Sequence, residues 1–309
     1  MSRGGGWRAV LGMNARNAHI DRVNSRTSVD LVNDKVATKL LLAAAGLPVP
    51  ATVSVIEDRR QLAALTPDSL PDAWALKPNH GRGGCGILLA GGREGADFRT
   101  VSGRPLSWRQ VVDHTRLVLH GEYSPAGRQR DTALVEPLLR VGDELGNVVP
   151  AGMPDVRVIC HDGLPVAAML RLPTVASGGR ANLHQGGIGA AVDLATGRVT
   201  AARWRRRPCR EHPDTGAPLV GLQIPAWRDV LSVASACADV TGLRYLGADV
   251  VFDRNHGHLV LEVNARPGLE IQNVHGQGLA LHLAERPDAR VVPFPREDVT
   301  PGRLTRTVA

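Results

Sequence analysis

Several segments of the chain have hydrophobic residues at the spacing that is typical of helices. Apolar side chains three or four residues apart are typical of an amphipathic helix, and a glycine directly after such a run is typical of the helix end. This pattern predicts helices at residues 34–45, 107–120 and 226–241. The first of them can be capped by Asn33 or Asp34 at its start, and Gly46 stands at its end.

Short β-branched or apolar runs bounded by turn residues predict strands. Glycine-rich polar segments at 79–86 and 178–189 predict loops. The strands follow one another as hairpins and not in strict strand-helix-strand order, which favours an α+β architecture over a doubly wound sheet. The predicted strands are residues 52–56, 73–77, 86–90, 133–141, 155–160, 166–172, 247–253 and 258–264.

The composition fits a globular protein with an anionic partner. The chain has 309 residues, of which 43% are hydrophobic and only 3% aromatic, and its net charge is +7. This length predicts about two packed lobes with mainly aliphatic cores. Nucleotide phosphates, nucleic acid or an acidic substrate would all suit the positive charge.

Part of the positive charge lies in one run, residues 203–207, which has the sequence Arg-Trp-Arg-Arg-Arg. The run is either a solvated turn or strand edge, or a surface for an anionic partner. Because Trp204 is its only aromatic residue, stacking on nucleic-acid bases is disfavoured. The four cysteines form no C-x-x-C pair, and residues 1–13 lack the apolar stretch of a secretory signal. We therefore expect reduced thiols, a cytoplasmic location and no membrane span.

The last predicted hairpin carries a candidate metal site. If a four-residue loop pairs Asp253 with His258, the register places Asp249 opposite Glu262, and Asn264 shares their face. Two facing carboxylates repel unless a charge neutralises them, and oxygen ligands suit Mg²⁺. The alternative is a pair of acids on a solvated face. The opposite, core face would carry Val250, Phe252, Leu259, Leu261 and Val263.

A candidate phosphate site lies earlier in the chain. Lys77 ends a predicted strand directly before a loop containing Gly81, Gly83 and Gly84. Glycines let backbone N–H groups approach phosphate oxygens, and the lysine adds a point charge. The spacing matches no standard nucleotide motif, so a plain turn is the alternative.

Glu136 interrupts an apolar strand and could accept a hydrogen bond from the amino group of adenine. The backbone near Leu138 would then contact the ring edge, whereas the alternative for Glu136 is an edge-strand acid facing water. Arg157 and Arg171 lie on a predicted strand pair and could stabilise a transferring phosphoryl group, or be surface residues.

The loop at 178–189 adds Arg180, Asn182 and His184, which could bind substrate or orient phosphate, and Arg266 follows the candidate metal residues. Among all these residues, the candidates for catalysis are Arg157, Arg171, Asn182 and Arg266.

Several motifs together resemble the alpha-L-glutamate ligase-like (RimK-related) branch of the ATP-grasp superfamily, over about residues 12–285. They are Gly12-Met-Asn-Ala-Arg-Asn17, Val32-Asn-Asp-Lys35-Val-Ala-Thr-Lys39, Ala45-Gly-Leu-Pro-Val-Pro50, Leu76-Lys77-Pro78, Val135-Glu136-Pro137, Asp155-Val-Arg157-Val, Asn182-Leu-His-Gln-Gly-Gly187, Gly247-Ala-Asp249 and Leu261-Glu262-Val-Asn264. The resemblance implies an α+β ATP-grasp fold whose two lobes clasp ATP. Its expected parts are a short N-terminal segment and helix (1–50), an N-terminal lobe (51–140), a C-terminal lobe (141–285) and a tail rich in Pro and Arg (286–309).

The resemblance also implies an activity. Lys35 and Lys77 would contact nucleotide phosphates, and Asp249, Glu262 and Asn264 would hold Mg²⁺, with Mn²⁺ as an alternative ion. A substrate carboxylate would attack the γ-phosphate of ATP, and an amine would then displace phosphate from the acyl phosphate to form an amide-type bond. Arg171 would stabilise the acyl-phosphate stage, with Arg157 nearby.

Three features depart from the family pattern. Only 34 residues precede Lys35, so the N-terminal domain common in related ligases is expected to be missing or reduced. That domain often helps to bind the substrate in related ligases. The resemblance therefore implies small-molecule or peptide carboxylate and amine substrates without naming them. Cys85 and Asn33 stand where a basic residue and an aspartate are expected. The alternatives to a ligase are an ATP-grasp protein of cell-surface or sugar-polymer modification, a nucleotide-binding module without turnover and, least favoured, a nucleic-acid binder.

Overall fold

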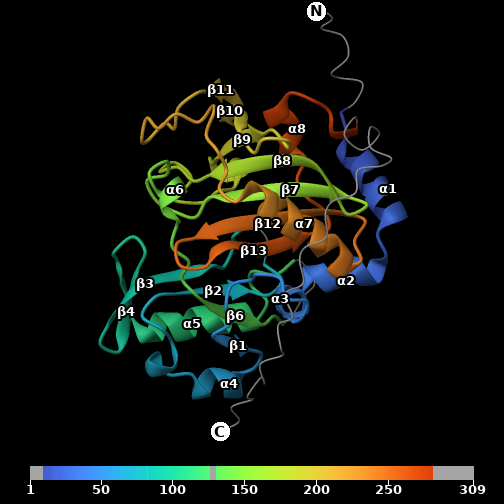
Figure 1. The fold of residues 1–309 in the computed structure, drawn as a ribbon. Coiled ribbons are helices and arrows are strands. Elements are labelled where there is room, and N and C mark those ends of the chain that lie inside the picture. The colour runs from blue at the N-terminus through green and yellow to red at the C-terminus, as the bar shows by residue number, and fades with distance from the viewer. Residues whose placement is uncertain (1–9, 82, 126–129, 281–309) are drawn as a thin grey trace, which may run out of the picture.

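The computed structural model describes residues 10–280 except 82 and 126–129. The predicted tail at 286–309 lies outside these residues. Helices and two antiparallel sheets form an α+β structure, with the larger sheet above the smaller one in Figure 1. Among the described helices, none combines the length and apolar character needed to cross a membrane. The helices are α1 (Met13–Val23), α2 (Arg26–Asn33), α3 (Lys35–Ala44), α4 (Arg59–Ala64), α5 (Trp108–Leu119), α6 (Asp143–Gly146), α7 (Trp227–Thr241) and α8 (Glu270–His275), with short 3-10 turns at Pro67–Ser69 and Leu183–Gln185.

The smaller sheet has six strands in the order β1-β6-β2-β3-β4-β5. Its central strands bury Trp74, Leu76 and Val135 on one face, in one cluster with side chains of α4 and α5. Since side chains alternate along a strand, Lys77 and Glu136 fall on the opposite face. The strands are β1 (Ser54–Ile56), β2 (Trp74–Pro78), β3 (Leu88–Glu94), β4 (Asp97–Thr100), β5 (Pro105–Leu106) and β6 (Ala133–Pro137).

The larger sheet has seven strands in the order β11-β10-β9-β8-β7-β12-β13. One face packs on α7 through residues such as Val158 and Leu246, and the other packs on α1 and α8 through residues such as Ile159 and Tyr245. Arg157 and Asp249 alternate in phase with this second face. The strands are β7 (Asp155–His161), β8 (Leu164–Leu172), β9 (Ile188–Val192), β10 (Val199–Trp204), β11 (Arg207–Cys209), β12 (Tyr245–Asp253) and β13 (Gly257–Asn264).

All three predicted helices are confirmed as α3, α5 and α7. Asp34 is the residue that caps α3, because its carboxylate accepts the Ala37 N–H at 2.8 Å, and Gly46 follows the helix with a φ of 78°. The eight predicted strands correspond to β1, β2, β3, β6, β7, β8, β12 and β13. The predicted elements omit α1, α2, α4, α6, α8, β4, β5, β9, β10 and β11.

The hairpin of β12 and β13 corrects one detail of the predicted register. Asp253 pairs with Gly257 and not with His258, so the turn is one residue tighter than predicted. A bulge between Asp249 and Val250 then restores the pairing of Asp249 with Glu262. The bulge also changes the core face: Val260 joins the core beside α7, whereas Leu261 is half-buried.

The arginine run at 203–207 forms the tip of the β10–β11 hairpin at the edge of the larger sheet. Trp204 pairs with Arg207, and the two turn residues Arg205 and Arg206 have φ values of 49° and 65°. The Arg205 guanidinium lies 4.8 Å from the centroid of the Trp204 ring. The run is therefore an exposed turn at a sheet edge.

Candidate functional site

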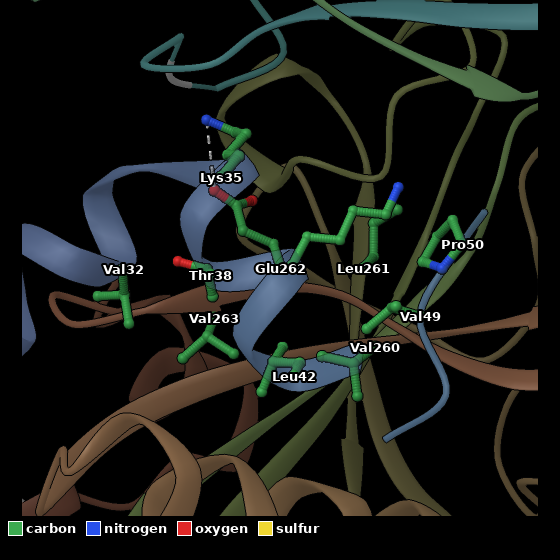
Figure 2. A pocket seen from close by; sticks show the side chains of 11 residues that line it. Val32, Lys35, Thr38, Leu42, Val49, Pro50, Val260, Leu261, Glu262 and Val263 are labelled. Carbon is green, nitrogen blue, oxygen red and sulfur yellow. Dashed lines mark ion pairs between the residues drawn. The ribbon is translucent and has the colours of Figure 1, made fainter. Parts of the chain in front are cut away.

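A pocket between α3 and β13 joins the segments that carry the candidate residues. Figure 2 shows Lys35 of α3 and Glu262 of β13 pointing toward one another across its rim, with an ion pair of 3.9 Å between them. The pocket is lined by Val32, Lys35, Thr38, Lys39, Leu42, Val49, Pro50, Val260, Leu261, Glu262 and Val263.

A network of arginines and carboxylates crosses β8, β7 and β12. Arg157 donates two hydrogen bonds to Asp249, of 2.7 and 2.6 Å, and Arg171 donates a third of 2.8 Å to the same carboxylate. Arg171 also holds Asp155 in two bonds of 2.5 and 2.8 Å. The side-chain amide of Asn264 donates a further hydrogen bond of 3.3 Å to the Asp249 carboxylate.

Burial and the neighbouring charges shift the pKa values of these groups in opposite directions. Burial alone would raise the pKa of Asp249, but Arg157 and Arg171 outweigh it and hold this pKa below its ordinary value. Burial raises the pKa of Asp155, and Arg171 offsets only part of that effect. Burial would lower the pKa of Arg171, but Asp155 and Asp249 raise it, so the guanidinium stays charged.

Lys35 of α3 contacts the backbone of the glycine loop. Its ammonium group donates to the carbonyl oxygens of Asn79, at 3.1 Å, and Gly81, at 2.6 Å. The Asn79 side chain in turn accepts the N–H of Val36 at 2.9 Å, at the start of α3. These contacts attach the glycine loop of the smaller sheet to the helix that faces Glu262.

The glycine loop requires glycine at particular positions. Gly83, Gly84 and Gly86 have φ values of 61°, 78° and 73°, which other residues adopt at a cost in free energy. A Cβ atom on Gly86 would lie 2.4 Å from the Tyr123 ring. On its other side the loop meets Gln185, whose amide donates to the Gly83 carbonyl at 3.0 Å. The described residues of the loop therefore contact α3 on one side and the turn between β8 and β9 on the other.

A second lysine cluster surrounds Glu136. Lys77 donates to one of its carboxylate oxygens at 2.5 Å, and Lys39 of α3 donates to the other. Burial would raise the pKa of Glu136, but Lys77 and Lys39 together hold it below its ordinary value. Burial lowers the pKa of Lys39, and Glu136 offsets part of this effect.

Glu136 is a buried residue of a central strand. It is only 4% exposed and lies within β6, between β1 and β2, so it is not an edge-strand acid facing water. Both of its oxygens face lysines in this structure. The Leu138 N–H donates to the Ala73 carbonyl at 3.1 Å, so this backbone donor is engaged as well.

The remaining predicted residues lie around the two clusters. Asn182 caps the turn at Leu183–Gln185, and its side-chain nitrogen lies 4.0 Å from the position of a Cβ on Gly83. Arg266 donates to Asp21 of α1 at 2.9 Å, and both side chains are exposed, so it lies outside the arginine and carboxylate network.

Two members of these clusters, Asp155 and Lys39, had no predicted role in the site. Asp155 starts a predicted strand and belongs to the motif Asp155-Val-Arg157-Val of the family resemblance, which was its only signal. Lys39 does carry a compositional signal, because the chain has only three lysines and all of them lie in this region: Lys35, Lys39 and Lys77.

The oxygen donors fit a hard divalent cation. Asp249 and Glu262 pair directly across the hairpin, Asn264 adds an amide group, and the Glu262 side chain is 38% exposed. The described part of the chain contains no group of three or more His, Cys, Asp and Glu side chains that could hold a metal. A cation at Asp249 would share this carboxylate with Arg157 and Arg171.

Two α+β parts, one with a glycine loop and a lysine, the other with a carboxylate pair on a hairpin, are typical of ATP-grasp proteins. A family model described as sugar-transfer associated ATP-grasp matches residues 14–286. The chain therefore belongs to this family. The predicted membership of the ATP-grasp superfamily and the predicted fold class are confirmed.

The chain is also similar to individual proteins. It is 26% identical over 266 residues to a probable alpha-L-glutamate ligase of Mannheimia succiniciproducens, covering 86% of this chain and 66% of the relative. A D-alanine–D-alanine ligase from Bacillus anthracis in complex with ATP is 14% identical, with a TM-score of 0.49, covering 84% of this chain and 65% of that one. The ATP-grasp ligase PsnB with its minimal precursor is 17% identical, with a TM-score of 0.43, covering 85% and 61%. The chain thus spans slightly less than two thirds of the length of these proteins.

Proposed function

We propose that this protein is a Mg-ATP-dependent carboxylate–amine ligase. The observation that carries the proposal is the contact of Lys35 with both the glycine loop and Glu262, because it joins a phosphate-binding loop to a cation-binding hairpin at one point. Membership of the ATP-grasp family supports a nucleotide site in this chain. Lys35, Lys77 and the glycine loop at 81–86 would hold the phosphates, with Glu136 and the backbone near Leu138 beside the adenine.

The residues of the larger sheet would carry the chemistry. Asp249, Glu262 and Asn264 would hold the divalent cation, which when bound neutralises phosphate charge and polarises the transferred group. Arg171 and Arg157 are fixed by their carboxylate partners, so they can face developing negative charge without a change in position. Asn182 would orient the phosphate from the loop that meets Gly83.

The proposed reaction has two steps. A carboxylate oxygen of the substrate attacks the γ-phosphorus of ATP, the bond to the bridging oxygen breaks, and ADP leaves. The nitrogen of the amine substrate then attacks the acyl carbon, phosphate leaves with the bonding electrons, and the nitrogen loses a proton. Positioning and charge stabilisation suffice for both steps, and no enzyme nucleophile is needed.

A second candidate follows from the family description, which associates its members with sugar transfer. In that case the same site would act in cell-surface or sugar-polymer modification. A nucleotide-binding module without turnover is a third. We also propose the lobe division 51–140 and 141–285 and a cytoplasmic location, which the four free cysteines of the described chain support.

The test is release of ADP in the presence of Mg²⁺ and a panel of carboxylates and amines. Glu262→Ala should reduce Mg²⁺-dependent ADP release by at least about 100-fold, because one of the two carboxylates for the cation is lost. Glu57→Ala, at an exposed position after β1, is the matched control and should retain full activity. Full activity of Glu262→Ala would remove this residue from the site, and tight ATP binding without ADP release from any pair would favour the binding module.

A further inference from the structure

Lysine is rare in this chain and occurs only near the candidate site. The chain has three lysines and 34 arginines, so arginine is the general cationic residue. All three lysines face the candidate site, two from α3 and one from β2. An ammonium group is a compact point charge whose bonds can be rearranged, whereas a guanidinium favours one planar geometry. Each of the three cations of the site can therefore change its hydrogen-bond partners more readily than an arginine could.

Lys39 is the member of this set without a proposed role. It lies four residues after Lys35 on α3, so both side chains leave the same face of the helix. Lys35 reaches the glycine loop, whereas Lys39 reaches Glu136 and the Ala51 carbonyl, the latter at 3.1 Å. Its side chain is 10% exposed, so these two contacts hold it in place.

The charges around Glu136 are unequal. Two lysines face one carboxylate, and the three side chains are 5 to 16% exposed. The group therefore carries one excess positive charge in a largely buried place, which is unfavourable without an anion. Because Glu136 has a separate oxygen for each lysine, one lysine can leave while the other still balances the carboxylate.

We propose that Lys39 is a positioning residue of the nucleotide site: it keeps Glu136 in place so that Lys77 can turn from Glu136 to the nucleotide phosphates. The proposal rests on the proposed function. Lys77 is the lysine that moves, since it comes directly before the glycine loop, whereas Lys39 is also held by the Ala51 carbonyl. Without Lys39, Glu136 would depend on Lys77 alone and would retain it.

The test measures the affinity for a fluorescent ATP analogue in four variants, and the thermal midpoint of each shows that it is folded. Lys39→Met should weaken binding about 10-fold, because Lys77 must then leave an otherwise unpaired Glu136. Lys39→Arg keeps the charge and should stay within about 3-fold of the wild type. The double variant Lys39→Met/Glu136→Gln should bind more tightly than Lys39→Met alone, because Lys77 is released. Arg60→Met, exposed on α4, controls for the loss of one positive charge and should bind as the wild type does.

The outcomes separate the two proposals. If the wild type does not bind the analogue, the proposed function fails. If the wild type binds and Lys39→Met binds equally well, the role of Lys39 is refuted while the function stands. A double variant that binds no more tightly than Lys39→Met would likewise refute it, since removal of the Glu136 charge would then not release Lys77.

Discussion

Asp249 is the point where removal of a single charge should have the largest effect on this protein. Its carboxylate is 2% exposed and accepts two hydrogen bonds from Arg157 and one from Arg171. Asp249→Asn would leave the two guanidiniums, 13% and 12% exposed, facing Asp155 as the only nearby carboxylate of their network.

The size of this effect follows from the burial of the network. Breaking a buried ion pair by removing one partner costs about 3–5 kcal/mol, since the other charge is left uncompensated. The double variant Asp249→Asn/Arg157→Met restores equal numbers of positive and negative charges, with Arg171 and Asp155 still paired. We expect it to recover about 2 kcal/mol of the loss, so the double variant should be more stable than the single variant.

The assay is thermal unfolding of the wild type, both single variants and the double variant at neutral pH. With roughly 2 °C per kcal/mol, Asp249→Asn should lower the midpoint by about 6–10 °C, and the double variant by about 4 °C less. Arg254→Met, which removes an exposed partner of Asp143, is the matched control and should change the midpoint by less than about 2 °C. A double variant with a midpoint equal to or below that of Asp249→Asn would refute the charge argument.

Two further predictions concern acid and the glycine loop. The folded-state pKa of Glu136 lies below its ordinary 4.5, so its stabilising contribution is present above pH 4.5 and is lost as the pH falls through the folded value. The thermal midpoint of Glu136→Gln should therefore fall less than that of the wild type as the pH is lowered from 4.5. Gly86→Ala should lower stability by about 2–4 kcal/mol in urea unfolding, because its Cβ would meet Tyr123 at a positive φ. Gly84→Ala, with a φ of 78° and open space around its Cβ, should lose only about 1 kcal/mol, and equal losses in the two variants would contradict the steric argument.

The sequence predicted the strands and helices that carry strong periodicity, but not the elements at the edges. The helix at 34–45 has a cap, an apolar middle and a terminal glycine, so local signals suffice to define it. By contrast α1 has the sequence MNARNAHIDRV, and only Ile20 of it is fully buried. Its place is set by contacts with distant residues such as Tyr245 and Ile271, which no local pattern contains.

The predicted pairing of Asp249 with Glu262 is correct, although the predicted turn that led to it is not. The predicted turn was one residue too long, and the bulge next to Asp249 compensates for that difference. Alternation along two strands gives the shared face, but a bulge depends on tertiary packing and has no clear signal in this sequence. The same limit explains Leu261, which was assigned to the core face and instead lines the pocket.

The charge balance of the site changes the argument for a cation. The sequence suggests that two facing carboxylates need a metal for neutralisation, yet Asp249 is balanced by arginines and Glu262 lies near Lys35. Counting the two arginines and three lysines of the clusters against four carboxylates leaves one positive charge. A divalent cation alone would therefore meet a site that is already slightly positive, and an anionic nucleotide would meet one that favours it. The repulsion of the carboxylates thus does not create the metal site; the negative charge that a cation requires would have to come largely from the nucleotide phosphates, so that cation and nucleotide bind together.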